Sequence, residues 1–120
     1  MVKKVLVVDD VPMQLEAIAS TLEKAGMNVI RAKDGEEAIA CIDRQLPDLV
    51  LLDVVMPRMN GFEVVRELRD REQTKKLPIV ICSTKNTEVD KVWGMDMGAD
   101  AYITKPFDSE QLVSIVQRLL

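Results

Sequence analysis

Four charged residues follow short apolar runs in this chain, and their chemistry is the most informative feature of the sequence. They are the pair Asp9 and Asp10, the single Asp53, and Lys105. Short apolar runs separated by helical patterns are typical of buried parallel strands, and ligands of such sheets bind beyond the carboxyl ends of the strands. We therefore expect these four side chains to converge at one edge of a sheet.

Carboxylates that are packed together repel one another, so three of them at one edge indicate a site for a hard cation. A lone aspartate after a strand is more simply explained as the cap of the next helix, but here there are three. Mg²⁺ suits an oxygen-only site that shares its shell with a phosphate, whereas Ca²⁺ fits less well because the chain has no EF-hand loop. The pattern predicts a magnesium site among Asp9, Asp10 and Asp53.

A compact positive charge and a hydroxyl accompany these carboxylates. Lys105 stands in a Thr-Lys-Pro-Phe run, which favours a functional role over that of a solvated surface lysine. Ser83 ends another apolar run, and Thr84 beside it is a rival hydroxyl. A carboxylate nucleophile flanked by Mg²⁺, an ammonium and a hydroxyl suits phosphoryl transfer, whose transition state needs charge neutralisation and alignment. The expected product is an aspartyl phosphate.

The elements that position these residues alternate between strand and helix five times. This alternation predicts a doubly wound α/β domain, with a parallel sheet covered by helices on both faces. Strands are expected at Lys4 to Val8, Asn28 to Ala32, Leu49 to Leu52, Ile79 to Cys82 and Ala101 to Ile103. Helices are expected from Pro12 to Ala25, from Glu36 to Arg44, after the loop from Pro57 to Gly61, from Glu88 to Met97, and after Asp108-Ser109, either of which suits the N-cap. In the third helix, Arg66 and Arg69 are expected to point outward.

Composition narrows the class of protein. The 120 residues have room for one domain, and the net charge of −4 argues against direct nucleic-acid binding. No apolar run approaches the roughly 18 to 20 residues of a membrane span, and no signal-peptide pattern is present, so we expect a cytoplasmic protein. Histidine is absent, which excludes histidine catalysis and ligation. Cys41 and Cys82 are expected to be buried, unpaired hydrophobes.

The whole chain, from about residue 3 to residue 120, resembles the receiver domain of two-component response regulators, and it is similar to single-domain chemotaxis and twitching-motility receivers. The motifs that carry this resemblance are Asp9-Asp10, Asp53-Val-Val-Met-Pro57 followed by Asn60-Gly61, Ser83, Gly98-Ala99-Asp100 and Lys105-Pro106. The resemblance implies a flavodoxin-like receiver fold of five strands in the order 2-1-3-4-5 and five helices. It also implies a cis peptide bond between Lys105 and Pro106.

The resemblance further implies a role for each residue of the site. Asp53 would accept the phosphoryl group from a histidine kinase or phosphotransfer protein. Asp9, Asp10, Asp53 and the backbone carbonyl of Val55 would hold Mg²⁺. Lys105 would bind a phosphoryl oxygen. The protein would act as a signalling switch that catalyses its own phosphotransfer and dephosphorylation, not as a turnover enzyme.

The same resemblance assigns the switch residues. Ser83 takes the position of the switch hydroxyl, and Tyr102 takes that of the aromatic residue that moves with it. Thr84 departs from the family, which more often has alanine or glycine there, so a bulkier side chain is expected to restrict access to the site. Val55 and Lys85 occupy positions that tune hydrolysis.

Phosphorylation is expected to repack the surface formed by the fourth helix, the fifth strand and the fifth helix. We expect no output domain after Leu120, so the expected readout is a downstream protein or a second copy of the chain, and the protein is expected to be a monomer or a phosphorylation-dependent dimer. Trp93, Tyr102 and Lys85 are expected near the centre of this surface. For Trp93 itself, the sequence leaves open whether it is a core anchor or an exposed contact for a partner.

Three other classes of protein are compatible with parts of the pattern. A phosphorylation-independent pseudo-receiver would lack part of the acidic and lysine set, all of which is present here. A phosphatase with an aspartate nucleophile would have a second aspartate two residues later, where this chain has Val55. A flavin-binding protein shares the fold class, but this chain has only four aromatic residues and no phosphate-cradling loop.

Overall fold

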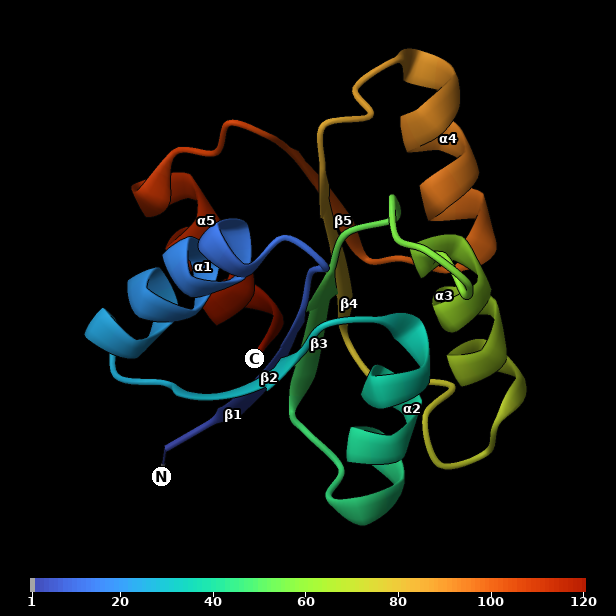
Figure 1. Ribbon diagram of the computed structural model, residues 1–120, viewed down its shortest axis with the longest axis horizontal. Coiled ribbons are helices and arrows are strands. Elements are labelled where there is room, and N and C mark those ends of the chain that lie inside the picture. Colours follow the sequence, from blue (N-terminus) through green and yellow to red (C-terminus); the bar gives the residue numbers. More distant parts are fainter. Residues whose placement is uncertain (1) are drawn as a thin grey trace.

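The computed structural model describes residues 2–120, which form a parallel sheet flanked by helices (Figure 1). The strands are β1 (Lys4–Val8), β2 (Asn28–Ala32), β3 (Leu49–Leu52), β4 (Ile79–Ser83) and β5 (Ala101–Thr104). The helices are α1 (Pro12–Lys24), α2 (Gly35–Arg44), α3 (Gly61–Asp70), α4 (Glu88–Met97) and α5 (Ser109–Leu119). The order of the strands is β2-β1-β3-β4-β5, as the resemblance implied. No helix among these residues is long and apolar enough to cross a membrane.

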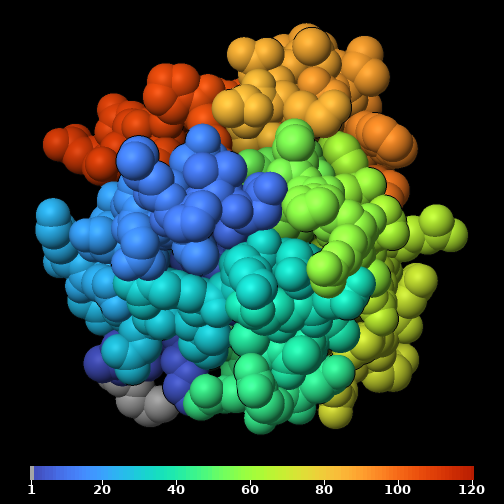
Figure 2. All heavy atoms as spheres, in the orientation of Figure 1, coloured from blue at the N-terminus to red at the C-terminus, as the bar shows by residue number. Residues whose placement is uncertain are grey.

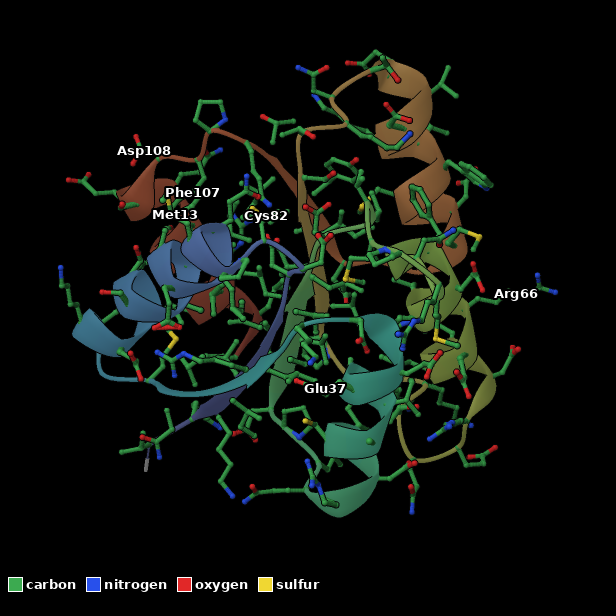
Figure 3. The ribbon with its side chains drawn as sticks, in the orientation of Figure 1. Met13, Glu37, Arg66, Cys82, Phe107 and Asp108 are labelled. Atoms are coloured by element: carbon green, nitrogen blue, oxygen red, sulfur yellow. The ribbon has the colours of Figure 1, made fainter. Side chains whose placement is uncertain are left out.

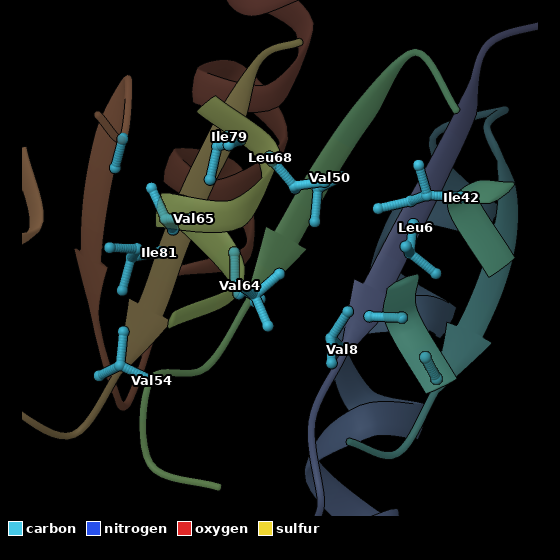
Figure 4. Close-up of a cluster of buried hydrophobic side chains, with 14 of the residues drawn as sticks. Leu6, Val8, Ile42, Val50, Val54, Val64, Val65, Leu68, Ile79 and Ile81 are labelled. Carbon is cyan, nitrogen blue, oxygen red and sulfur yellow. The ribbon is translucent and has the colours of Figure 1, made fainter. Parts of the chain in front are cut away.

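Two hydrophobic clusters pack against the two faces of the sheet. One joins alternate strand residues to α2 and α3, as in the packing of Val64, Val65 and Leu68 against β3 and β4 (Figure 4). The other joins the opposite strand faces to α1 and α5. Strands buried on both faces explain the continuous apolar runs in the sequence, because alternate residues enter different clusters. Cys41 and Cys82 are both buried and unpaired, as expected, and burial raises the pKa of Cys82 to about 12.

Side chains fix where four of the five helices begin. Asp34, Asn60 and Asp108 each accept hydrogen bonds from backbone N–H groups of the following first turn. Thr87 caps α4 through a reciprocal capping box with Asp90. Helix α1 begins instead with Pro12, whose missing N–H suits a first helical turn. Asp108, rather than Ser109, is therefore the N-cap of the last helix.

The elements differ from the sequence-based prediction at their ends and at one side chain. Strands β4 and β5 each extend one residue further, to Ser83 and Thr104. The larger difference is Arg69, which does not simply point outward. Its guanidinium donates to the carbonyls of Gly98, Thr74 and Leu77 at 2.9, 3.1 and 2.7 Å, and to the carboxylate of Asp100 at 3.0 Å.

The carboxylate of Asp100 also accepts from the backbone N–H of Ile79 at 2.8 Å, so Arg69 and Asp100 together tie α3 to the start of β4 and the turn after α4. Periodicity places position 69 on the outer half of the helix and does not reveal the carbonyl acceptors in the loop after α3 and at Gly98. Arg66, three residues earlier, does extend away from the molecule (Figure 3).

We expect Arg69→Met to lower the free energy of unfolding by about 2 to 3 kcal/mol, because it leaves backbone carbonyls without a donor. Arg66→Met is the matched control on the same helix, and it should change stability by less than about 0.5 kcal/mol. Urea denaturation monitored by circular dichroism measures the stability of both variants. Equal losses in the two variants would contradict a special role for Arg69.

Candidate functional site

The carboxyl ends of β1, β3 and β5 bring Asp9, Asp53 and Lys105 into direct contact. The Lys105 ammonium donates to Asp9 Oδ2 at 2.6 Å and to Asp53 Oδ2 at 2.8 Å. Asp9 and Asp53 are only 1% and 5% exposed, and the lysine side chain is 7% exposed. Asp9, Asp53 and Lys105 are far apart in the sequence but form one buried ion cluster. Their convergence was predicted from the sequence.

Backbone hydrogen bonds set these positions, because each residue extends the ladder of the sheet just past a strand. The N–H of Asp9 donates to the carbonyl of Ala32, that of Asp53 to Val8, and that of Lys105 to Ser83. The side chains therefore start from a rigid edge and not from mobile loops. The peptide bond between Lys105 and Pro106 is cis, which confirms the expectation from the resemblance.

The second oxygen of each carboxylate is also held. Asp9 Oδ1 accepts from the Val11 N–H at 3.0 Å, and Asp53 Oδ1 accepts from the Val55 N–H at 2.9 Å. Both aspartates are thereby fixed in orientation, with one oxygen on the backbone and the other on Lys105. This arrangement leaves Asp53 a buried carboxylate whose position is set before any substrate arrives.

The charge of Lys105 is maintained by its acidic partners. Burial of the ammonium on its own lowers the pKa of Lys105, but hydrogen bonds from the ammonium to Asp53 and Asp9 outweigh this effect and raise the pKa above the ordinary lysine value. Lys105 is therefore a cation at neutral pH, in contact with two aspartates. The three groups together carry a net charge of −1, to which Asp10 adds another negative charge.

The carboxylates of the predicted magnesium site lie just beyond the ends of β1 and β3. Three carboxylates are the oxygen ligands that Mg²⁺ prefers, and Asp10 is half-buried beside Asp9. Among residues 2–120, however, no three acidic, histidine or cysteine side chains are grouped closely enough to hold a metal ion. Asp9 and Asp53 share Lys105 instead, and Asp10 stays outside that contact. Three of the four charged groups that were expected to converge are thus in direct contact, and the role of Asp10 in metal binding stays a prediction.

Gln14 is a residue of the site that sequence reasoning missed. Its Oε1 accepts from the Lys105 ammonium at 2.5 Å, so the three N–H groups of Lys105 have Asp9, Asp53 and Gln14 as partners. An amide can satisfy the third donor without adding charge. Its place in the first turn of α1, directly after the acidic pair, was the signal that could have identified it.

Two predicted switch residues meet at the backbone of Lys85. Ser83 is fully buried, and its Oγ accepts from the Lys85 N–H at 3.2 Å. The Tyr102 hydroxyl donates to the Lys85 carbonyl at 2.7 Å, and burial of the ring raises the pKa of Tyr102. Thr84 is exposed, and it lines a hollow next to Lys105.

Trp93 lies elsewhere than expected. Its ring stacks on Phe62 of α3, with centroids 4.8 Å apart and an interplanar angle of 29°, and the residue is 54% exposed. It is therefore neither a core anchor nor grouped with Tyr102 and Lys85. Helical periodicity identified its flank of α4 but gave no information on which neighbouring element that flank meets.

Comparisons with known proteins agree with this geometry. The model of the response regulator receiver domain matches residues 5–117. The chain belongs to this family. Protein PilH of Pseudomonas aeruginosa is 40% identical over 117 residues, which cover 98% of this chain and 97% of PilH. The regulatory protein PhoP of Bacillus subtilis, which controls alkaline phosphatase synthesis, is 42% identical over 98% of this chain but only 48% of its own length.

Solved receiver structures share the whole fold. A response regulator from Chloroflexus aurantiacus superposes with a TM-score of 0.96 at 34% identity, covering 99% of this chain and 98% of that one. The chemotaxis response regulator CheY4 of Vibrio cholerae superposes with a TM-score of 0.93 at 38% identity, over the full length of both chains. The receiver domain described here is thus a phosphorylation-accepting switch of a two-component system.

We expect Lys105→Met to lower the free energy of unfolding by about 3 kcal/mol at pH 7, because it leaves Asp9 and Asp53 buried without a counter-charge. The double variant Lys105→Met/Asp53→Asn should recover much of this loss, since only one buried charge remains. Urea denaturation of the four proteins of this cycle, with the exposed Lys76→Met as control, measures the coupling.

The stabilisation contributed by the Lys105 ammonium depends on pH. The pKa of Lys105 is raised in the folded state, so its contribution is fully present below the unfolded value of about 10.4 and is lost as the pH rises through the folded pKa. The stability gap between wild type and Lys105→Met should narrow above about pH 10.5. A gap that stayed constant between pH 7 and pH 11 would contradict the ion-pair interpretation.

Proposed function

We propose that Asp53 is the phosphoryl acceptor and that a histidine kinase or phosphotransfer protein is the donor. The observation that carries this proposal is the contact of one lysine ammonium with both Asp53 and Asp9 in a buried site at the strand ends. Of the two aspartates in this contact, Asp53 directly follows β3, the central strand of the sheet, and the Val55 N–H fixes the orientation of its carboxylate.

The reaction forms a bond between an Asp53 carboxylate oxygen and phosphorus, while the bond from phosphorus to the donor's imidazole nitrogen breaks. The imidazole leaves with the electron pair of that bond. The Val55 N–H keeps the Asp53 carboxylate in line, and Lys105 shifts its hydrogen bonding from the carboxylate towards the phosphoryl oxygens. Gln14 and Asp9 retain the ammonium during that change, because they bind its other N–H groups.

Asp9, Asp10, Asp53 and the Val55 carbonyl are the groups that would hold Mg²⁺. When bound, the ion supplies further neutralisation of charge on the phosphoryl oxygens. The donor set of carboxylates and a carbonyl is suited to this ion, and the family to which the chain belongs generally uses it at the phosphorylation site.

The switch is proposed to operate through Lys85. A phosphoryl group that accepts a hydrogen bond from the Ser83 hydroxyl would draw the Ser83 Oγ inward, away from the Lys85 N–H that donates to it, and the Lys85 carbonyl accepts from the Tyr102 hydroxyl. Displacement of this one backbone unit therefore frees both Ser83 and Tyr102. The output surface is formed by α4, β5 and α5, and its target is a downstream protein in the cytoplasm. The protein then serves as a signal carrier and not as a turnover enzyme.

Asp53→Asn should abolish labelling by a small phosphodonor such as acetyl phosphate with Mg²⁺, because a neutral amide replaces the nucleophilic carboxylate. Asp70→Asn, at an exposed position of α3, should label as wild type does. Intact mass and site mapping after rapid acid quench measure the modification. Unchanged labelling of Asp53→Asn would contradict the assignment of Asp53 as the phosphoryl acceptor.

Mg²⁺ should raise the melting temperature of the wild type, since it binds the native carboxylates and relieves a repulsion that the unfolded chain does not have. Asp10→Asn should blunt this response, whereas Asp70→Asn should not. Differential scanning fluorimetry across a Mg²⁺ titration provides the comparison. An equal shift in wild type and Asp10→Asn would show that the cation binds elsewhere.

A further inference from the structure

Helix α4 carries an exposed apolar stripe that the phosphorylation site does not use. Val89 is 75% exposed, Val92 is 56% exposed and Trp93 is 54% exposed. Their spacing of three and four residues places them on one side of the helix, where they line a shallow hollow together with Glu88 and Asp96. Contiguous exposed apolar side chains rimmed by polar groups are characteristic of binding surfaces.

This stripe lies towards α3 and not towards the surface of β5 and α5. Gly94 is the residue of α4 that faces the sheet, where an added Cβ would meet Ile81 and Tyr102. Trp93 stacks on Phe62, the second residue of α3. In the ribbon view, α4 lies beside α3, on the opposite side of the sheet from α5 (Figure 1). In the space-filling view, the orange atoms around α4 meet the green atoms around the start of α3 (Figure 2). The stripe is thus separate from the border of α4 at Gly94, which faces Tyr102 of β5.

The charges of α4 indicate what kind of partner fits. The helix has three acidic residues and one lysine, and the two charged residues that line the hollow, Glu88 and Asp96, are both acidic. On the adjoining face of α3, exposed Glu63 and Arg66 offset each other. A second copy docked through a two-fold axis would bring like charges together, and an anionic membrane would be repelled.

We propose that the stripe of Val89, Val92 and Trp93 binds an amphipathic helix of another protein, one whose apolar face carries flanking lysine or arginine residues. The apolar face of the helix covers the two valines and packs on the exposed part of the Trp93 ring. Its basic flanks meet Glu88 and Asp96. Apolar anchors at helical spacing supply the affinity of such a complex, and complementary charges supply its specificity.

Trp93 is the only tryptophan in the chain, so its fluorescence reports on this surface directly. The probes are three synthetic peptides without tryptophan: an amphipathic helix of leucine and lysine, the same helix with glutamate in place of lysine, and a scrambled leucine–lysine peptide of identical composition. The amphipathic leucine–lysine helix should shift the emission of Trp93 to the blue and bind at least tenfold more tightly than the other two.

Val89→Ser/Val92→Ser should weaken binding of the amphipathic leucine–lysine helix by at least tenfold while keeping the circular dichroism spectrum. Met13→Ser is the matched control, because Met13 is 82% exposed on α1, and it should bind as wild type does. The proposal does not depend on phosphorylation, so it is tested with the unphosphorylated protein. The outcome is independent of the role of Asp53.

Four results would overturn it. Equal affinity for the glutamate peptide would exclude charge complementarity. Equal binding by Val89→Ser/Val92→Ser and wild type would place the peptide elsewhere. A dimer in sedimentation that the double substitution dissociates would show that a second copy covers the stripe. A blue shift of Trp93 with anionic phosphatidylserine vesicles, abolished by the same substitution, would assign it to a membrane.

Discussion

The contact of the Lys105 ammonium with two buried aspartates is the interaction on which the site depends. Two carboxylates with almost no exposure to water cannot both stay ionised at low cost unless a cation neutralises them. Lys105 supplies this cation, and Gln14 satisfies the donor that is left. All three N–H groups of the Lys105 ammonium therefore have acceptors, yet a phosphoryl oxygen could replace one of these acceptors. The hydrogen bonds that stabilise the site are thus the same ones that phosphoryl binding would use.

The sheet makes this contact possible by placing the three residues on a rigid edge. Asp9, Asp53 and Lys105 each bond through their backbone N–H to a neighbouring strand, so the positions of their α-carbons vary little. The start of α3 is equally constrained. A Cβ at Gly61 would collide with the carbonyl of Asp53, so only glycine allows the helix to approach the acidic residue this closely. A side chain at that position would push α3, and Phe62 with it, away from the end of β3.

Sequence reasoning reached the fold and most of the site because both depend on local patterns. The apolar runs, the proline at the start of α1 and the positions of Asp53 and Lys105 at strand ends are all visible in the order of residues. The contacts of Arg69 and Gln14 were missed for a common reason. Each joins segments distant in sequence through a side chain long enough to reach several acceptors, and periodicity reports only which way a residue points. Repulsion among carboxylates predicts a cation but does not say whether lysine or a metal ion supplies it, so the sequence did not reveal that Lys105 alone bridges Asp9 and Asp53.

The two borders of α4 are physically distinct, and this distinction bears on how one small domain could address more than one partner. Ser83 and Tyr102 both bond to Lys85, so the border towards β5 is linked to the phosphorylation site by hydrogen bonds that have few alternative geometries. The border towards α3 is held by the apolar stack of Trp93 on Phe62, which has no directional bond to the site. Hydrogen bonds are directional and respond to the arrival of a charged group over short distances, whereas apolar association is non-directional. The border towards β5 is therefore suited to a phosphorylation-sensitive output, and the border towards α3 is suited to an association that persists in both states.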